Sequence, residues 1–321
     1  MLFTNVFVEY KSSKKSNLYI QKTLSKTSPQ YLKEFSFVVV DNSIDNENYE
    51  KLSTHLNKNY IEIVDDNIYI RKVIFEYNGF IIPIFYVKNV SNSGYGAGNN
   101  LGVKIAKKHL NPKFVIISNN DIYCIDTYID YNSVLTIFDS KDDVAVIGVN
   151  IENLDGSKQN PQRFVPFFNR WIIPELLFPL NRKFKNSGGD LIENAKTNYV
   201  YRLRGTFIFI NTDIFLECGG FDENIFLYCE EPILAERLLK KKYKMYYYND
   251  IHMIHDHTMD GSSITSSEIK KIKQRFKSEI YYYRNYIKVS GLSIFVAKML
   301  FPFLILKYRI FFFLRKKKKK G

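Results

Sequence analysis

The sequence is poor in cysteine, which limits how the fold can be held together. Only three cysteines occur among 321 residues, an odd number without a short pairing motif: Cys124, Cys218 and Cys229. This pattern argues against a disulfide framework and favours a reducing compartment such as the cytosol. The spacing of these cysteines also matches no recognised zinc-binding motif, which argues against a structural zinc site.

Several other features are missing. The sequence has no internal repeat, and its first ten residues are too short an apolar run, followed by charged residues, for a signal peptide. We therefore expect a cytoplasmic protein. The sequence also lacks an RNP-like aromatic motif and a helix-turn-helix pattern, so we expect no nucleic-acid partner. A net charge of +13 nevertheless keeps a basic nucleic-acid-binding protein as an alternative.

The positive charge is unevenly distributed along the chain. Residues 315–320 contribute six of the 13 net charges, and the other seven belong to the rest of the sequence. Hydrophobic residues make up 45% of the chain, which at this length allows one large core or two modest ones. The composition therefore predicts a moderately basic globular domain, suited to phosphates or anionic lipid, with a basic tail.

Short apolar runs alternate with helical segments through the first half of the chain. Residues 35–40 form a continuous β-branched and apolar run, which is typical of a strand buried on both faces of a parallel sheet. Further strands are expected at 2–8, 82–87, 114–117, 144–149 and 205–210, and helices at 16–25, 101–110, 212–218 and 232–241. The pattern predicts an α/β fold with a doubly wound, mainly parallel sheet and helices on both faces.

Three polar features follow strands of this predicted sheet. They are Asp41, the glycine- and asparagine-rich segment 92–102, and Asp121. Ligands of doubly wound sheets bind beyond the carboxyl ends of the strands. A glycine loop before a helix can bring its backbone against a ligand, although a plain glycine-rich turn is the alternative. Three such features at one edge favour a nucleotide site.

The order of these motifs resembles that of the family 2 glycosyltransferases, in particular their bacterial rhamnosyltransferase-like branch. The resemblance extends over residues 38–286 and implies a GT-A fold. It is carried by Val-Val-Val-Asp-Asn-Ser at 38–43, the Asn-x-Gly-Tyr-Gly-x-Gly-Asn-Asn loop from 92, Asn-Asn-Asp at 119–121, Arg-Gly-Thr at 204–206, and Gly-Gly-Phe-Asp-Glu at 219–223 followed by Glu230-Glu231.

The resemblance implies a nucleotide-diphosphate sugar donor, bound mainly by residues 1–150, and an acceptor and catalytic half at 151–286. The implied donor-binding residues are Asp41, Asn92, Gly94, Tyr95, Gly96, Gly98, Asn99, Asn100, Asn120, Arg204 and Gly205. A divalent cation, Mg²⁺ or Mn²⁺, would be held by Asp121, Asn119, His255 and His257. Such a cation bridges the donor phosphates as a Lewis acid and prefers oxygen ligands. Helix capping is the alternative role for Asp121.

The general base of the implied reaction is expected in the Glu230-Glu231 pair. An acceptor hydroxyl attacks the anomeric carbon opposite the leaving diphosphate, so the configuration inverts, and a positioned carboxylate removes the proton. We expect Glu231 to be the base and Glu230 to be the second candidate. The choice stays open, because the family's usual Glu-Asp pair is here Glu-Glu. The alternative is that the pair only caps the helix predicted at 232–241.

The C-terminal segment 287–321 has a composition of its own. Residues 292–306 are mostly apolar, interrupted at Phe301-Pro302, and a second apolar stretch precedes the basic run 315–320. This predicts an interfacial amphipathic helix with a polybasic anchor on an anionic membrane, peripheral to the inner face of the cell membrane. A core helix with a solvated tail is the alternative.

The sequence thus predicts an inverting glycosyltransferase of cell-surface polysaccharide synthesis, such as capsule or O-antigen. Its acceptor would be a glycan or a lipid-linked glycan, and the transferred sugar could be rhamnose. A catalytically silent nucleotide-sugar-binding protein is a second reading, because the Glu-Glu pair departs from the family pattern.

Overall fold

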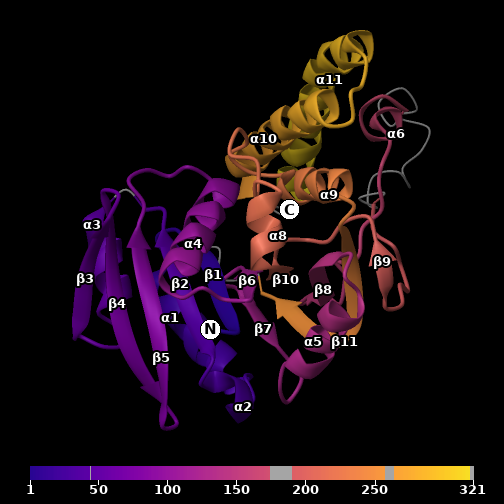
Figure 1. Ribbon diagram of the computed structural model, residues 1–321. Helices are drawn as coiled ribbons and strands as arrows, with labels where there is room; N and C mark the ends of the chain where they lie inside the picture. Colours follow the sequence, from indigo (N-terminus) through magenta and orange to yellow (C-terminus); the bar gives the residue numbers. More distant parts are fainter. Residues whose placement is uncertain (44, 174–189, 257–263, 319–321) are drawn as a thin grey trace.

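A computed structural model describes residues 1–43, 45–173, 190–256 and 264–318. Its centre is a single 11-stranded sheet with the strand order β3-β4-β5-β2-β1-β6-β10-β8-β11-β7, and β9 pairs with β11 at the side (Figure 1). The strands are β1 (Phe3–Glu9), β2 (Phe35–Asp41), β3 (Tyr60–Asp65), β4 (Ile68–Tyr77), β5 (Phe80–Lys88), β6 (Phe114–Ser118), β7 (Ile122–Cys124), β8 (Val144–Asn153), β9 (Asn198–Val200), β10 (Phe207–Asn211) and β11 (Lys244–His255).

The sheet combines parallel and antiparallel strand pairs. Strand β1 runs parallel to both β2 and β6. Strand β2 also runs parallel to β5, and β8 runs parallel to β11. Strand β10 is antiparallel to both of its neighbours, and β3, β4, β7 and β9 are also antiparallel to theirs. The predicted α/β fold is confirmed, with a mixed sheet in which Asp41 and His255 end strands that have a parallel neighbour and Asp121 follows another such strand.

Helices cover both faces of the sheet, as predicted. They are α1 (Ser13–Ser25), α2 (Pro29–Leu32), α3 (Asn46–Ser53), α4 (Tyr95–His109), α5 (Tyr131–Ser140), α6 (Phe167–Trp171), α8 (Thr212–Glu217), α9 (Glu230–Lys240), α10 (Ile264–Asn285) and α11 (Gly291–Lys318). Helices α1, α3 and α5 contribute to one core cluster, and α4, α8 and α9 to the cluster on the opposite face. Because successive strand residues point to opposite faces, Phe7 joins the first cluster and Val6 the second.

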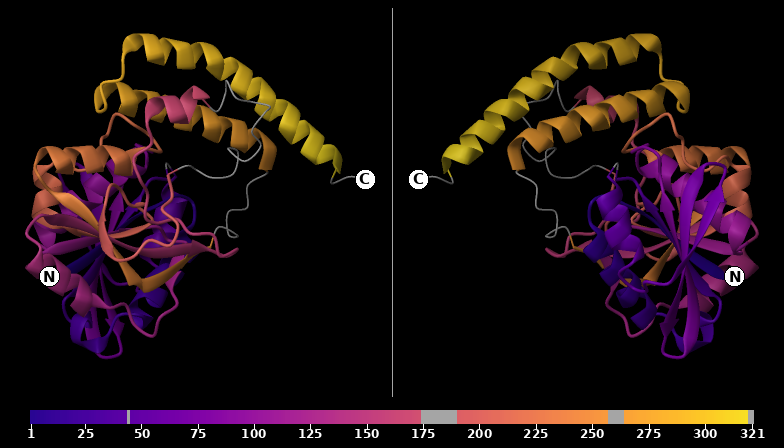
Figure 2. Two further views of the ribbon diagram at one scale, coloured as in Figure 1. Left: turned by 90° about the vertical axis from the view of Figure 1, so that its right-hand side faces the viewer. Right: turned by 90° about the vertical axis from the view of Figure 1, so that its left-hand side faces the viewer.

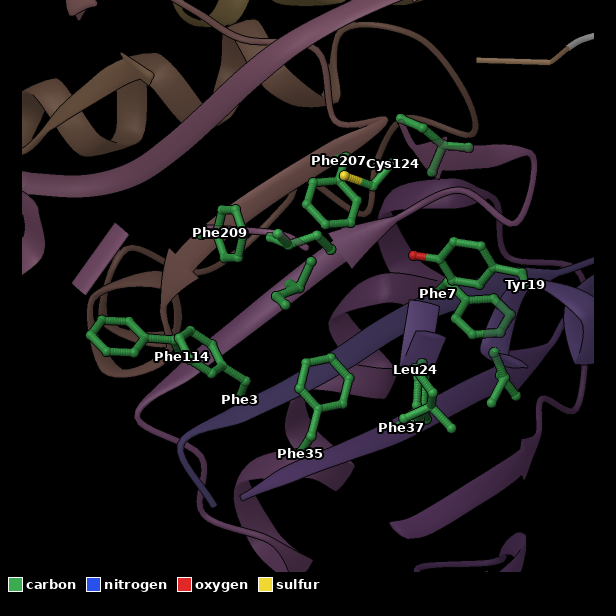
Figure 3. Packing of buried hydrophobic residues seen from close by; sticks show 14 of the residues in the cluster. Phe3, Phe7, Tyr19, Leu24, Phe35, Phe37, Phe114, Cys124, Phe207 and Phe209 are labelled. Carbon is green, nitrogen blue, oxygen red and sulfur yellow. The ribbon is translucent and has the colours of Figure 1, made fainter. Parts of the chain in front are cut away.

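Aromatic side chains fill the core on the α1 side of the sheet. Figure 3 shows rings from several strands side by side, including those of Phe3, Phe35 and Phe114. Phe114 stacks on Phe138 of α5 with ring centroids 4.5 Å apart. Removing such a buried ring costs about 3–5 kcal/mol. This packing holds α5 against the strand that leads to Asp121.

Helices α4 and α9, which carry predicted site residues, begin earlier than the sequence predicts, and α1 begins at Ser13 where the sequence predicts a start at residue 16. Helix α4 begins at Tyr95 and not at Leu101, so most of the glycine-rich segment is helical. A Cβ atom at Gly98 would lie 2.8 Å from Val8, and one at Gly102 would lie 2.5 Å from Val6. These glycines therefore let α4 pack closely against the sheet, and this packing outweighs their low helix propensity.

Helix α9 begins at Glu230, where the sequence predicts a start at Pro232. Its N-cap, Cys229, has a left-handed φ of 73°. Pro232 is consequently the third residue of the helix, where its missing N–H costs no intrahelical hydrogen bond. Glu230 and Glu231 thus belong to the first turn of α9.

Helices α10 and α11 form a layer of their own beyond the sheet (Figure 2). Phe276 of α10 stacks on Phe301 of α11 with ring centroids 3.7 Å apart. Helix α11 continues through Pro302, where the sequence suggests an interruption. By length and composition, residues 291–310 could cross a membrane, and 22% of that segment is buried. Its exposed apolar side chains are Leu292, Phe295, Val296, Met299, Phe303, Leu306 and Ile310.

Candidate active site

A large cleft opens where the carboxyl ends of the central strands face the layer of α10. It encloses about 1820 Å³. The expected site residues on its wall are Tyr95, Asn119, Arg204, Gly205, Glu230, Glu231 and His255. They come from α4, the turn after β6, the segment before β10, α9 and the end of β11. The fold thus brings residues that are up to 160 positions apart, Tyr95 to His255, to one cavity.

Asp121 and His255 meet at the edge of this cleft. The Asp121 Oδ1 atom lies 3.0 Å from His255 Nε2, and the His255 Nδ1 atom lies 2.9 Å from Gln159 Nε2. Both side chains are almost fully buried, and the ammonium of Lys15 lies 3.4 Å from Asp121 Oδ2. A carboxylate oxygen is a suitable ligand for Mn²⁺ or Mg²⁺, and an imidazole nitrogen facing it suits a transition metal such as Mn²⁺ better than Mg²⁺.

The protein itself supplies few ligands to such a cation. Within the four described ranges, no group of three or more His, Cys, Asp or Glu side chains could hold a metal. His257, the fourth expected ligand, lies outside the described residues. Mg²⁺ in particular keeps several waters and takes substrate phosphates as ligands, so a pair of protein ligands fits a cation delivered with a diphosphate.

The two neighbouring asparagines have different surroundings. Asn119 lines the cleft, and its backbone N–H donates to Thr206 O at 2.9 Å. The Asn120 side chain points away, donating to Ser12 Oγ at 3.1 Å and to Ser16 Oγ at 2.8 Å. Asn120 thus fixes the first turn of α1 beside the turn that carries Asp121.

Glu231 on α9 is held in place by the segment before β10. The Glu231 Oε1 atom accepts a hydrogen bond from the Gly205 N–H at 2.8 Å, and the Tyr95 hydroxyl donates to Gly205 O at 2.8 Å. Burial of Tyr95, followed by the charges of Glu231 and Glu230, raises the pKa of its hydroxyl well above the usual value. Tyr95 therefore remains a hydrogen-bond donor at neutral pH.

Glu230 has a different environment from Glu231. Its side chain is 3% exposed, and among the described residues its Oε1 atom has no hydrogen-bond partner. Burial, reinforced by the neighbouring charge of Glu231, raises the pKa of Glu230 to about 8. The Glu230 carboxyl thus keeps its proton at pH 7.

Asp41 lies at the expected strand end but is fully buried in a polar network. Its Oδ2 atom lies 3.1 Å from Lys88 Nζ, and its Oδ1 atom accepts from the Ser43 N–H at 2.8 Å and from Asn48 Nδ2 at 3.1 Å. Asn48 also donates to Glu9, a residue that the sequence analysis assigns no role. Burial raises the pKa of Glu9 to about 7.

Most side chains at the start of α4 do not line the cleft but hold the backbone around it. Asn92 Oδ1 accepts from the Gly94 N–H at 3.2 Å, and Asn99 Nδ2 donates to Tyr95 O at 3.0 Å. Asn100 holds the backbone of Phe221. Of the expected donor ligands, those outside the cleft lining are Asp41, Asn92, Gly94, Gly96, Gly98, Asn99, Asn100 and Asn120. Their assignment as donor ligands stays a prediction.

The part of the cleft formed by residues 151–286 contains arginines that the sequence analysis missed. Arg170 of α6 makes a two-pronged pair with Glu279 of α10, at 2.8 Å and 2.7 Å. Arg202 pairs with Asp190, and Arg163 and Arg275 also line the cavity. These residues are scattered in sequence without a motif, so only the folded chain brings them together.

The architecture has counterparts among solved structures. No protein-family model and no curated protein sequence matches the chain. Among solved structures, the fold is that of the GT-A glycosyltransferases. It is similar to GalNAc-T7, crystallised with UDP, GalNAc and Mn²⁺, with a TM-score of 0.54 at 13% identity over 88% of this chain and 50% of that one. The chain thus spans about half the length of GalNAc-T7.

Two further structures share the fold. TarS 1–349 of S. aureus, in complex with UDP-GlcNAc, has a TM-score of 0.50 at 14% identity, covering 92% of this chain and 69% of that one. The mannosyltransferase PcManGT of Pyrobaculum calidifontis, in complex with GDP-Man and Mn²⁺, has a TM-score of 0.50 at 11% identity, covering 90% and 65%. At these identities the likeness concerns the fold.

Proposed function

We propose that the chain is a glycosyltransferase that moves a sugar from a nucleotide-diphosphate donor to a hydroxyl of a glycan acceptor. The observation that carries the proposal is that two pairs of polar residues, Asp121 with His255 and Glu230 with Glu231, lie at one cleft of a GT-A fold. Glu230, Glu231 and His255 line the cavity of about 1820 Å³, and Asp121 lies 3.0 Å from His255. The structures that share the fold contain nucleotides or nucleotide sugars in their complexes.

In this proposal, Asp121 and His255 hold a divalent cation together with the donor. The bound cation, Mn²⁺ or Mg²⁺, supplies Lewis-acid stabilisation of the leaving diphosphate. Gln159 contacts His255 Nδ1 and so orients the imidazole with Nε2 toward Asp121. Lys15 adds a positive charge beside the same carboxylate, which suits a site for a negatively charged leaving group.

Glu231 is the proposed general base. A base must be able to take up a proton, and Glu230 already carries one at pH 7, since burial raises its pKa to about 8. The Gly205 N–H fixes Glu231 on the cleft wall by a hydrogen bond of 2.8 Å. Attack from the face opposite the diphosphate would invert the anomeric configuration.

The proposed acceptor lies at a membrane surface. The apolar side chains exposed on α11 recur at three- and four-residue spacing, so they form one face, while Ile294, Ala297 and Leu304 on the other face are buried against α10 and its neighbours. A helix packed on one side and apolar on the other suits the plane of a membrane interface. The basic residues after it suit the anionic inner face of a cell membrane, where a lipid-linked glycan would be extended with rhamnose or another sugar.

Ligand-dependent stability tests the proposal directly. Thermal unfolding is measured with UDP, GDP and dTDP, each with and without Mn²⁺, because a ligand that binds the folded state stabilises it. We expect one diphosphate to raise the midpoint, more so with Mn²⁺, and the corresponding nucleotide sugars to be hydrolysed or transferred. A protein that binds a nucleotide sugar but never turns it over would be the silent alternative.

A further inference from the structure

The acceptor half of the cleft contains an incompletely paired cluster of guanidinium groups. Arg204, Arg202 and Arg275 all line the cavity. In the part of the chain that the structure describes, the buried Nε atoms of Arg204 and Arg202 have no hydrogen-bond partner. Unpaired buried donors are costly, and these three cations line one cavity, so an anion bound there would offset the cost of holding their charges together.

The nearby carboxylates are already engaged. Both oxygens of Glu279 are bound by Arg170, which leaves Arg275 at 3.9 Å from Glu279 Oε1. Asp190 pairs with Arg202. Burial lowers the pKa of Arg204, and repulsion from Arg275 and Arg202 acts in the same direction, against the attraction of Glu231 and Asp190.

We propose that Arg204 and Arg275, with Arg202 beside them, bind a phosphate group of the acceptor. The proposal rests on the proposed function and specifies its substrate class: a glycan acceptor that carries a phosphate near the hydroxyl to be glycosylated. Arg204 immediately precedes Gly205, whose N–H holds Glu231, so the phosphate site and the base are adjacent. Planar guanidinium groups match phosphate oxygens in paired hydrogen bonds. Arg204, expected from the sequence to contact the donor, is thereby assigned to the acceptor.

Calorimetric titration with inorganic phosphate and glycerol 3-phosphate tests this site, with and without the nucleotide diphosphate that binds best. Both probes should bind the wild type, also when the nucleotide is saturating. Arg204→Gln and Arg275→Gln should each weaken the probes roughly 10- to 100-fold, the loss expected for a charge-assisted hydrogen bond. Nucleotide affinity should not change. The matched control is Arg284→Gln, an exposed arginine on the same helix as Arg275.

The outcomes separate the two proposals. Failure of phosphate to bind the wild type, or equal binding to both cleft variants, overturns the acceptor site. Competition between phosphate and nucleotide, with Arg204→Gln weakening the nucleotide, also overturns it by assigning the residue to the donor. If the wild type binds phosphate but no nucleotide, the proposed function is overturned and the phosphate site is not.

If Arg204→Gln does not fold, the phosphate affinity of Arg275→Gln alone tests the acceptor site. Tighter binding of farnesyl diphosphate than of glycerol 3-phosphate identifies a lipid-linked acceptor, and the reverse identifies a soluble one.

Discussion

Asn100 and Phe221 are joined by two hydrogen bonds of 2.9 Å. The side-chain Oδ1 of Asn100 accepts from the Phe221 N–H, and its Nδ2 donates to the Phe221 carbonyl oxygen. The two residues are 121 positions apart, and the pair fastens α4 to the Gly-Gly-Phe-Asp segment that leads to the glutamate pair. An asparagine that the sequence marks for donor binding thus holds the backbone of the segment before the glutamate pair.

Replacing this amide should destabilise the fold. Asn100→Asp keeps the acceptor but removes both donated bonds, to Phe221 O and to Glu223, and sets a carboxylate against them. We expect a loss of about 1–3 kcal/mol in the free energy of unfolding, measured by urea denaturation. Asn59→Asp, in an exposed loop, is the control and should change little. Equal stability of both variants would contradict a structural role for Asn100.

Asp121→Asn should remove the cation dependence of nucleotide binding. The substitution keeps the size of the side chain but removes the charge that favours a divalent cation beside His255. Mn²⁺ should then add nothing to the thermal stabilisation by the nucleotide. The control is Asp126→Asn, because Asp126 also pairs with a histidine, His252 at 3.1 Å, but this histidine does not line the cleft as His255 does. A normal Mn²⁺ effect in the Asp121 variant would eliminate this residue as a ligand.

Glu231→Gln should bind donor and acceptor normally and lose transfer. Without a carboxylate to take the proton, the turnover number should fall roughly 10²- to 10⁴-fold, with little change in KM. Glu230→Gln should retain most of the activity, because its protonated carboxyl is already neutral like an amide. If Glu230→Gln loses activity and Glu231→Gln keeps it, Glu230 is the base. If both variants stay active, the pair only caps α9.

The stability of Glu230→Gln should depend on pH in a defined direction. The pKa of Glu230 rises from 4.5 to about 8 on folding, so between these values the folded state binds more protons than the unfolded one. Wild-type stability therefore falls as pH rises through this window, by up to about 1.4 kcal/mol per pH unit. Glutamine does not titrate, so the melting temperature of the variant relative to the wild type should increase from pH 5 to 8 and then level off. A difference independent of pH would refute the raised pKa.

The exposed face of α11 can be tested without disturbing its packing. Phe295 and Phe303 are 60% and 70% exposed, so replacing both by serine should leave the contact between α10 and α11 intact. We expect the double variant to sediment less with anionic vesicles, at low and at high salt. Neutralising residues 315–320 should weaken binding only at low salt, where the electrostatic attraction is unscreened. Nucleotide binding should persist in both variants. If the wild type does not sediment with anionic vesicles, the proposed membrane-binding role of α11 is refuted.

The sequence predicted the α/β class and the helices on both faces because buried strands and their connecting helices have strong local patterns. It did not predict where α4 begins, since the fit of Gly98 and Gly102 against Val8 and Val6 is a property of the packed sheet. The residues of the cleft likewise divide into those that the sequence predicts and those that only the folded chain reveals. Asp121, Glu230 and Glu231 follow recognisable motifs, whereas Arg202 and Arg275 follow none and meet only through the tertiary fold.

The stacking of Phe276 on Phe301 has a consequence for how an acceptor is found. Arg275 lines the cleft, and the next residue anchors the helix whose far side is apolar. One short stretch of α10 thus ties the orientation of the cleft to that of the proposed membrane-facing surface. A transferase bound to a membrane in the proposed way would search for its acceptor by lateral diffusion in two dimensions, and its encounter rate would depend on the surface density of acceptors in the bilayer and not on their concentration in bulk solution.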